Sequence, residues 1–123
     1  MSLVDRILLA LAGLTGFLGI AGSAAAAHSD GGETLRMAST FLLLHAPLIV
    51  GLVSLSLREG WQAMLARIAG GTILLGLALF SGDLALRALA GTPLFPMAAP
   101  SGGIVLMAGW LLVMITGLLP RGR

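Results

Sequence analysis

Apolar residues dominate four stretches of the chain, and short polar segments separate these stretches. The predicted helices cover about residues 3–27, 35–57, 62–90 and 102–119. The apolar part of each reaches the roughly 17 to 25 residues that a helix needs to cross a hydrocarbon core of about 30 Å. Backbone groups in lipid must be satisfied within their own segment, so we predict transmembrane helices even where Gly, Thr and Val lower helix propensity.

The separators are typical of turns. Residues 28–34 are polar and glycine-rich, residues 58–60 read Arg-Glu-Gly, and residues 91–100 contain Pro93, Pro96 and Pro100. Proline and glycine interrupt helices and favour turns. Short turns between consecutive spans give antiparallel neighbours. The sequence therefore predicts an all-α fold, an integral membrane up-and-down four-helix bundle, as a single domain over residues 1–123.

The composition excludes several classes of protein. Of the 123 residues, 58% are hydrophobic and 10% are charged, whereas a soluble domain carries about 25% charged residues. The seven basic residues are all Arg and are spread along the chain, so no nucleic-acid-binding patch is predicted. Cysteine is absent, which excludes disulfides and thiolate metal sites.

The first apolar stretch has a second interpretation. Arg6, an apolar core and the run Ala24 to Ala27 resemble a cleavable signal peptide. The apolar run is long for such a peptide, and Asp5 disrupts the positive region that should precede it. We therefore expect a retained transmembrane helix.

Arginine distribution predicts the orientation. Five Arg residues lie at the N-terminus, the second connection and the C-terminus, and two lie at the other end of the predicted spans; the five are Arg6, Arg58, Arg67, Arg121 and Arg123. Positively charged residues favour the cytoplasmic side of a membrane. We expect both termini in the cytoplasm and a multi-pass location in the bacterial inner membrane.

Small residues are spaced for helix packing. Glycines at intervals of three form a narrow groove along the first helix, and small residues let membrane helices approach closely. Glycines of the third and fourth helices are expected to supply the facing surface. The predicted packing positions are Gly13, Gly16, Gly19, Gly22, Gly70, Gly71 and Gly109.

His45 is the first candidate for chemistry. It follows Arg36 by nine residues, which places it roughly 14 Å into the bilayer at 1.5 Å per residue. An ionisable residue at that depth is a functional candidate. The structural alternative is a neutral imidazole that is hydrogen-bonded to a Ser, Thr or carbonyl of a neighbouring helix and assisted by Pro47. Trp110 is expected to pack against a glycine face.

A second polar group lies in the third helix. Asp83 and Arg87 are four residues apart, the spacing of a helical ion pair that would need no further function. The sharper hypothesis adds His28 at the outer end of the first helix, as a cluster that binds a proton or cation. Together with His45 and Ser81, these residues form the candidate intramembrane polar site.

No other chemistry is predicted. The two His residues lie at different depths, which argues against a bis-histidine haem, and the Met residues lack ligand-like spacing. There is no nucleophile with a base, phosphate loop or pair of carboxylates. We expect no catalytic residue, metal or cofactor, and no enzymatic activity.

The order of several short motifs resembles the YgdD-like family of small four-helix bacterial inner-membrane proteins of unknown function, which has mitochondrial relatives. The motifs are Ala24 to His28, His45, Phe80-Ser81-Gly82 and the stretch from Pro100 through Gly102-Gly103 to Gly109-Trp110. The chain lacks the two glycines that the family commonly places before its first His. It also has Asp83 where Ser is usual.

Two functions are compatible with these features. The first is a structural, accessory or assembly subunit that packs through glycine-rich faces against a larger respiratory or photosynthetic membrane complex. The second is a channel or carrier for a small ion or solute. It would be a homo-oligomer with His45 and Asp83 on the transport pathway. The expected partners are the lipid bilayer and other membrane subunits.

Overall fold

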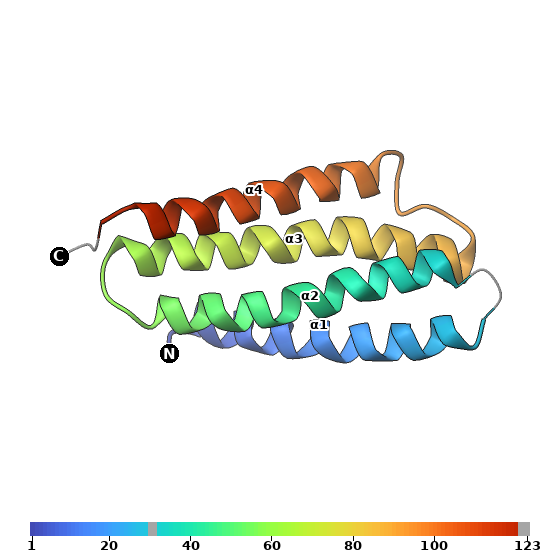
Figure 1. The fold of residues 1–123 in the computed structure, drawn as a ribbon, viewed down its shortest axis with the longest axis horizontal. Coiled ribbons are helices and arrows are strands. Elements are labelled where there is room, and N and C mark those ends of the chain that lie inside the picture. The colour runs from blue at the N-terminus through green and yellow to red at the C-terminus, as the bar shows by residue number, and fades with distance from the viewer. Residues whose placement is uncertain (30–31, 121–123) are drawn as a thin grey trace.

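The computed structural model describes residues 1–29 and 32–120, and within them the chain forms helices and no strand. The helices are α1 (Leu3–Ala27), α2 (Glu33–Ser56), α3 (Trp61–Ala90) and α4 (Ala98–Leu118), as Figure 1 shows. All four are long and apolar enough to cross a membrane. The predicted all-α membrane bundle is confirmed.

The helices begin and end at recognisable local signals. Ser2 caps α1 in a capping box, in which its side chain and that of Asp5 each accept a backbone N–H of the other residue. Gly91 ends α3 in the left-handed region at φ 72°, a conformation that costs glycine little because it has no Cβ.

α4 begins at Ala98, four residues before the predicted start. Pro100 was expected to lie in the connection, but it occupies the first turn of the helix. A proline is tolerated there because the first N–H groups of a helix have no intrahelical acceptor. The start of a helix is therefore less visible in the sequence than its apolar part.

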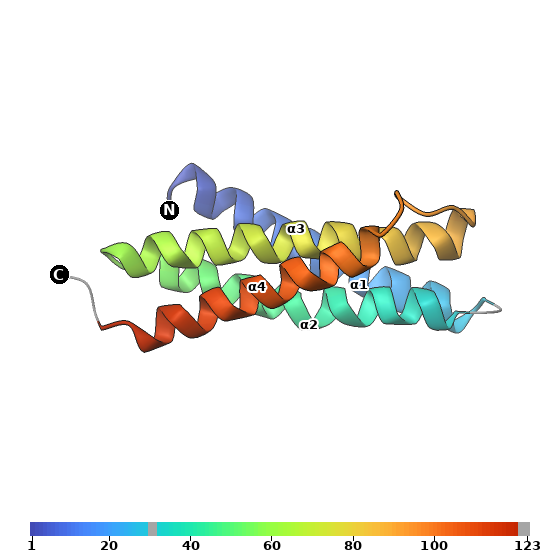
Figure 2. The same cartoon turned by 90° about the horizontal axis from the view of Figure 1, so that it is seen from above.

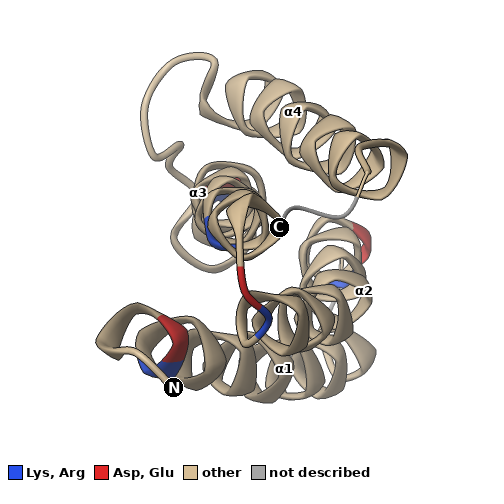
Figure 3. Cartoon of the chain, turned by 90° about the vertical axis from the view of Figure 1, so that its left-hand side faces the viewer, with Lys and Arg blue, Asp and Glu red and all other residues tan. Residues whose placement is uncertain are grey.

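The helices pack mainly against their neighbours in sequence. Figure 3 looks along the helices and shows α3 between α4 and the α1–α2 pair. The backbone of α4 comes close to that of α3 and to no other helix. α1 packs along α2 and makes only a small contact with α3. Figure 2 shows that α1 and α4 run obliquely to α2 and α3. The start of α1 and the end of α4 lie at the same end of the bundle.

The outer surface of the bundle is apolar. Large hydrophobic side chains are exposed on every helix, including Phe17 (67%), Leu44 (63%), Leu89 (73%) and Leu118 (74%). An apolar surface of this extent is unfavourable in water and is typical of contact with another apolar phase. The chain is a small membrane protein whose helices face lipid.

α3 and α4 approach closely at glycines. A Cβ placed on Gly102 would collide with the backbone N of Phe80, and one on Gly109 would lie 2.5 Å from Cδ1 of Ile73. Close backbone approach at small residues gains van der Waals contact, which drives helix association in lipid.

We predict that Gly102→Ala destabilises the protein by about 1–3 kcal/mol, because the added methyl meets rigid backbone. Gly103→Ala is the matched control, since a Cβ at that neighbouring position has no described atom within 4 Å. Circular dichroism during thermal unfolding in detergent measures both. Equal stability of the two variants would contradict the tight α3–α4 contact.

Candidate functional site

His45 joins α2 to α4 through a side-chain hydrogen bond. Its Nε2 accepts the indole N–H of Trp110 at 3.1 Å, and its Nδ1 lies 2.7 Å from the carbonyl oxygen of Phe41 one turn earlier. An indole is only a donor, so Nε2 must carry a lone pair and Nδ1 the proton. The geometry assigns a neutral imidazole with both ring nitrogens occupied.

Aromatic rings surround this histidine. The imidazole stacks on Phe41 at a centroid distance of 5.8 Å and meets Trp110 edge-on at 5.8 Å. Phe41 in turn lies 4.4 Å from the ring of Phe80 on α3. The imidazole is 6% exposed, whereas Trp110 is 48% exposed. The indole thus covers one side of the histidine while its own outer face remains open.

The partners of His45 differ from those expected. We expected a Ser, Thr or carbonyl of a neighbouring helix, whereas the carbonyl belongs to α2 itself and the neighbouring donor is Trp110. Trp110 was expected only to pack against a glycine face. That prediction took no account of the indole N–H, which needs a hydrogen-bond acceptor in an apolar environment.

Asp83 connects α3 to the segment that follows it. Its carboxylate is fully buried and accepts Nε of Arg87 at 3.0 Å and the backbone N–H of Leu94 at 2.8 Å. The first contact is the i, i+4 ion pair expected from the spacing. The second could not be seen in the sequence, because it depends on how residues 91–97 fold back.

The other candidate residues lie elsewhere. The hydroxyl of Ser81 donates to the carbonyl of Ala38 on α2 at 2.9 Å. His28 is an exposed residue at the C-terminal end of α1, and the ion pair that Asp83 makes among the described residues is with Arg87 and not with His28. The structure therefore does not bring His28 and Asp83 together as a cation-binding cluster. The acidic residue Asp30, in the connection that follows His28, lies outside the described residues.

A buried ion pair that the sequence analysis missed lies at the opposite end of the bundle. Asp5 is 1% exposed. Its Oδ1 accepts hydrogen bonds from Nε of Arg67 at 2.8 Å and from the hydroxyl of Ser56 at 2.6 Å, and its Oδ2 accepts one from Nη2 of Arg67 at 3.1 Å. The same guanidinium also donates to the carbonyl of Ser56 at 3.0 Å. One carboxylate thereby joins α1, α2 and α3.

The only local signal for this network was the Ser-x-x-Asp capping box at residues 2–5. It places Asp5 at the start of a helix but does not identify Arg67, which lies 62 residues later. Arg67 had been counted only as a positive charge that favours the cytoplasmic side.

The glycines of α1 do not face α3 and α4 as expected. A Cβ on Gly16 would lie 3.7 Å from that of Ala46, one on Gly19 would lie 2.7 Å from Cγ of Leu43, and one on Gly22 would collide with the side chain of Ser39. All three contacts are with α2. A short turn makes α2 the antiparallel neighbour of α1, which explains the choice of partner.

The remaining predicted packing glycines occupy different environments. A Cβ on Gly70 would lie 3.4 Å from methyl groups of Leu8 on α1, an ordinary to tight contact. Gly13 and Gly71 have no described atom within 4 Å of such a Cβ. These two positions are open on the outside of the bundle.

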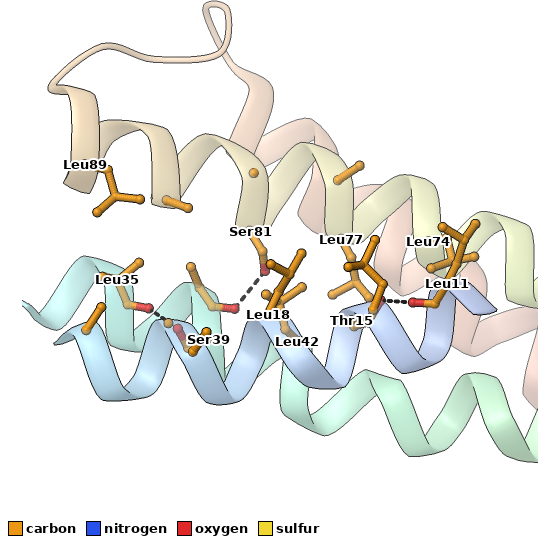
Figure 4. A pocket seen from close by; sticks show the side chains of 18 residues that line it. Leu11, Thr15, Leu18, Leu35, Ser39, Leu42, Leu74, Leu77, Ser81 and Leu89 are labelled. Carbon is orange, nitrogen blue, oxygen red and sulfur yellow. Dashed lines mark hydrogen bonds between the residues drawn. The ribbon is translucent and has the colours of Figure 1, made fainter. Parts of the chain in front are cut away.

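An apolar groove of about 570 Å³ lies between α1 and α3, with α2 as its floor. Figure 4 shows the side chains that line it. The lining is mostly Leu, Ala and Gly; its hydroxyl-bearing residues are Thr15, Ser39 and Ser81. Each hydroxyl donates to a backbone carbonyl (Figure 4), so the groove offers no unpaired hydroxyl proton.

Among the described residues, the buried polar groups find their hydrogen-bond partners within the chain. No buried side-chain nitrogen or oxygen among them lacks a hydrogen-bond partner, and no group of three His, Asp or Glu residues is close enough to hold a metal ion. Asp5, His45 and Ser81 use their hydrogen bonds to join helices. Thr15, Ser39 and Thr116 donate to carbonyl groups of their own helix.

A family model described as a protein of unknown function (DUF423) matches residues 18–103, more than half of the chain. The chain belongs to the DUF423 family. This confirms the predicted membership of a family of small proteins of unknown function. Neither a curated protein nor a solved structure matches this DUF423 protein.

We predict that Trp110→Phe lowers the stability of this DUF423 protein by about 0.5–1.5 kcal/mol, the usual net value of one hydrogen bond. The substitution keeps an aromatic ring but leaves Nε2 of His45 without its donor. Denaturant titration of the purified protein in detergent measures the change. Trp61→Phe is the control, and an equal loss there would show that the hydrogen bond is unimportant.

We also predict that Asp5→Asn lowers the unfolding temperature by several degrees, because the substitution removes the charge that pairs with Arg67 at a buried position. Glu33→Gln makes the same chemical change at an exposed residue in the first turn of α2. Thermal unfolding in one detergent compares them, and an Asp5→Asn protein as stable as the Glu33→Gln protein would contradict the role of the network.

Proposed function

We propose that this protein is an accessory or assembly subunit of a larger membrane complex, and that it docks through the outward faces of α1 and α4. The observation that carries the proposal is the set of open glycines on the lipid-facing surface, which includes Gly13 on α1 and Gly117 on α4. Glycine allows another transmembrane helix to approach its backbone closely.

The arrangement of the helices supports the choice of these two faces. α4 has close backbone contact with α3 alone, and α1 lies at the other edge of the bundle, so each has surface that the chain itself does not cover. The described connections are short, which leaves little room for a ligand-binding domain outside the membrane. Contact with other subunits within the bilayer is therefore the simplest use of the fold.

The alternative, an oligomeric channel or carrier that uses His45 and Asp83, has weaker support. Both nitrogens of His45 and both oxygens of Asp83 are engaged in hydrogen bonds within the chain. A transport pathway needs polar groups that can exchange partners with an ion or with water. Solute flux in liposomes that is lost in both His45→Ala and Asp83→Asn would favour transport over docking.

We propose further that the protein is not an enzyme, and that it lies in the bacterial inner membrane with both termini in the cytoplasm. The arginine count supports this orientation. Arg121 and Arg123, which contribute to the count, lie outside the described residues.

Co-purification from the native membrane in a mild detergent tests the docking proposal. We expect a stoichiometric complex with the wild-type protein and its loss in Gly13→Leu, because a bulky side chain would prevent close approach. Gly51→Leu is the matched control, since Gly51 of α2 is equally open but lies outside the proposed faces. A wild-type protein that elutes alone as a monomer or homodimer would contradict the proposal.

A further inference from the structure

α1 and α3 are held together at one end and diverge from there. Near the N-terminus, Asp5 binds Arg67, and Leu8 packs against Gly70. The groove begins one turn further along, where Leu11 and Leu74 line it, and continues toward Ala25 on α1 and Leu89 on α3. Figure 4 shows the two helices separating toward Leu89. The ion-paired end is thus closed, and the other end is open.

The dimensions of the groove decide which occupant fits. From Leu11 to Ala25 it follows fifteen residues of α1, which are fourteen steps or ~21 Å at 1.5 Å per residue. A volume of about 570 Å³ over that length gives a mean cross-section of ~27 Å², against ~80 to 110 Å² for a helix of 10–12 Å diameter. A transmembrane helix of a partner or of a second copy is too wide to be enclosed by the groove and could only rest across its open side.

A single hydrocarbon chain has the right width. Carbon atoms pack at about 4 Å from one another, so one chain occupies a cross-section of ~15 to 20 Å² at that spacing. No charged residue lines the groove, and its three hydroxyl groups donate within the protein. The lining therefore suits an apolar chain and would leave a polar one without partners.

We propose that the groove between α1 and α3 binds one hydrocarbon chain of a membrane lipid, which enters sideways from the leaflet nearer the α1–α2 turn. The exposed His28 lies one turn beyond Ala25 on the same side of α1, at the level where the lipid headgroup would remain. This binding site goes beyond the accessory role, because it uses the inner face of α1 and not the open face that carries Gly13.

Photolabelling tests the site in the full-length protein. The protein is placed in nanodiscs of phosphatidylethanolamine and phosphatidylglycerol that contain a small fraction of phosphatidylglycerol with a diazirine near the end of one acyl chain. Mass spectrometry then maps the labelled residues. We expect labelling at groove residues such as Leu18, Leu42 and Ala78 to exceed that at the lipid-facing Ile104 by at least ~5-fold, since a held chain spends longer beside its site.

Two glycine substitutions on α3 separate a bound chain from surrounding lipid. A Cβ at Gly82, in the groove, or at Gly71, outside it, has no described atom within 4 Å, so both positions accept a larger side chain. Gly82→Leu should fill the groove and reduce its labelling several-fold. Gly71→Leu should leave the labelling unchanged.

Either of two results would overturn the proposal. They are labelling of the groove no stronger than labelling of Ile104, and labelling that Gly82→Leu does not reduce. Neither of these outcomes depends on whether Gly13 docks a subunit, so the two proposals can fail separately.

Discussion

The buried carboxylate of Asp5 is the contact on which the arrangement of three helices depends. It binds the guanidinium of Arg67 and the hydroxyl of Ser56, and it also caps α1 through Ser2. A charge at such a position is stable only if its lone pairs are occupied by donors. Because α1 and α3 have few other contacts, this pairing sets where they touch and where they diverge. The shape of the groove follows from it.

The attachment of α4 has a different physical basis. Glycine positions in α3 and α4 allow close backbone contact, and the hydrogen bond between Trp110 and His45 links α4 to α2. Lipid provides no hydrophobic drive between helices, so such contacts decide association. The result is a bundle in which several polar groups join helices through residues that are distant in the sequence.

The sequence was sufficient for features that depend on local pattern. Four apolar runs of spanning length predicted four helices, and the spacing of Asp83 and Arg87 predicted their ion pair. These features are local because a helix satisfies its own backbone and brings residues four apart together. The start of α4 was less clear, since Pro100 is compatible both with a turn and with a first helical turn.

Long-range partners could not be predicted in the same way. Nothing near Asp5 identifies Arg67, and nothing near Trp110 identifies His45, because both pairs depend on the relative rotation of helices. The glycine spacing of α1 indicated close packing but not that α2 would be the partner. The groove was invisible for the same reason, since it arises from a divergence between helices that are not consecutive.

The separation of Asp5 from Arg67 has a consequence for biosynthesis. The carboxylate is translated 62 residues before its guanidinium partner. The α1–α2 hairpin can already form its glycine contacts and the hydrogen bond from Ser56 to Asp5, but the charge of Asp5 has no guanidinium partner until Arg67 follows. The third helix thus completes the tertiary structure of the first.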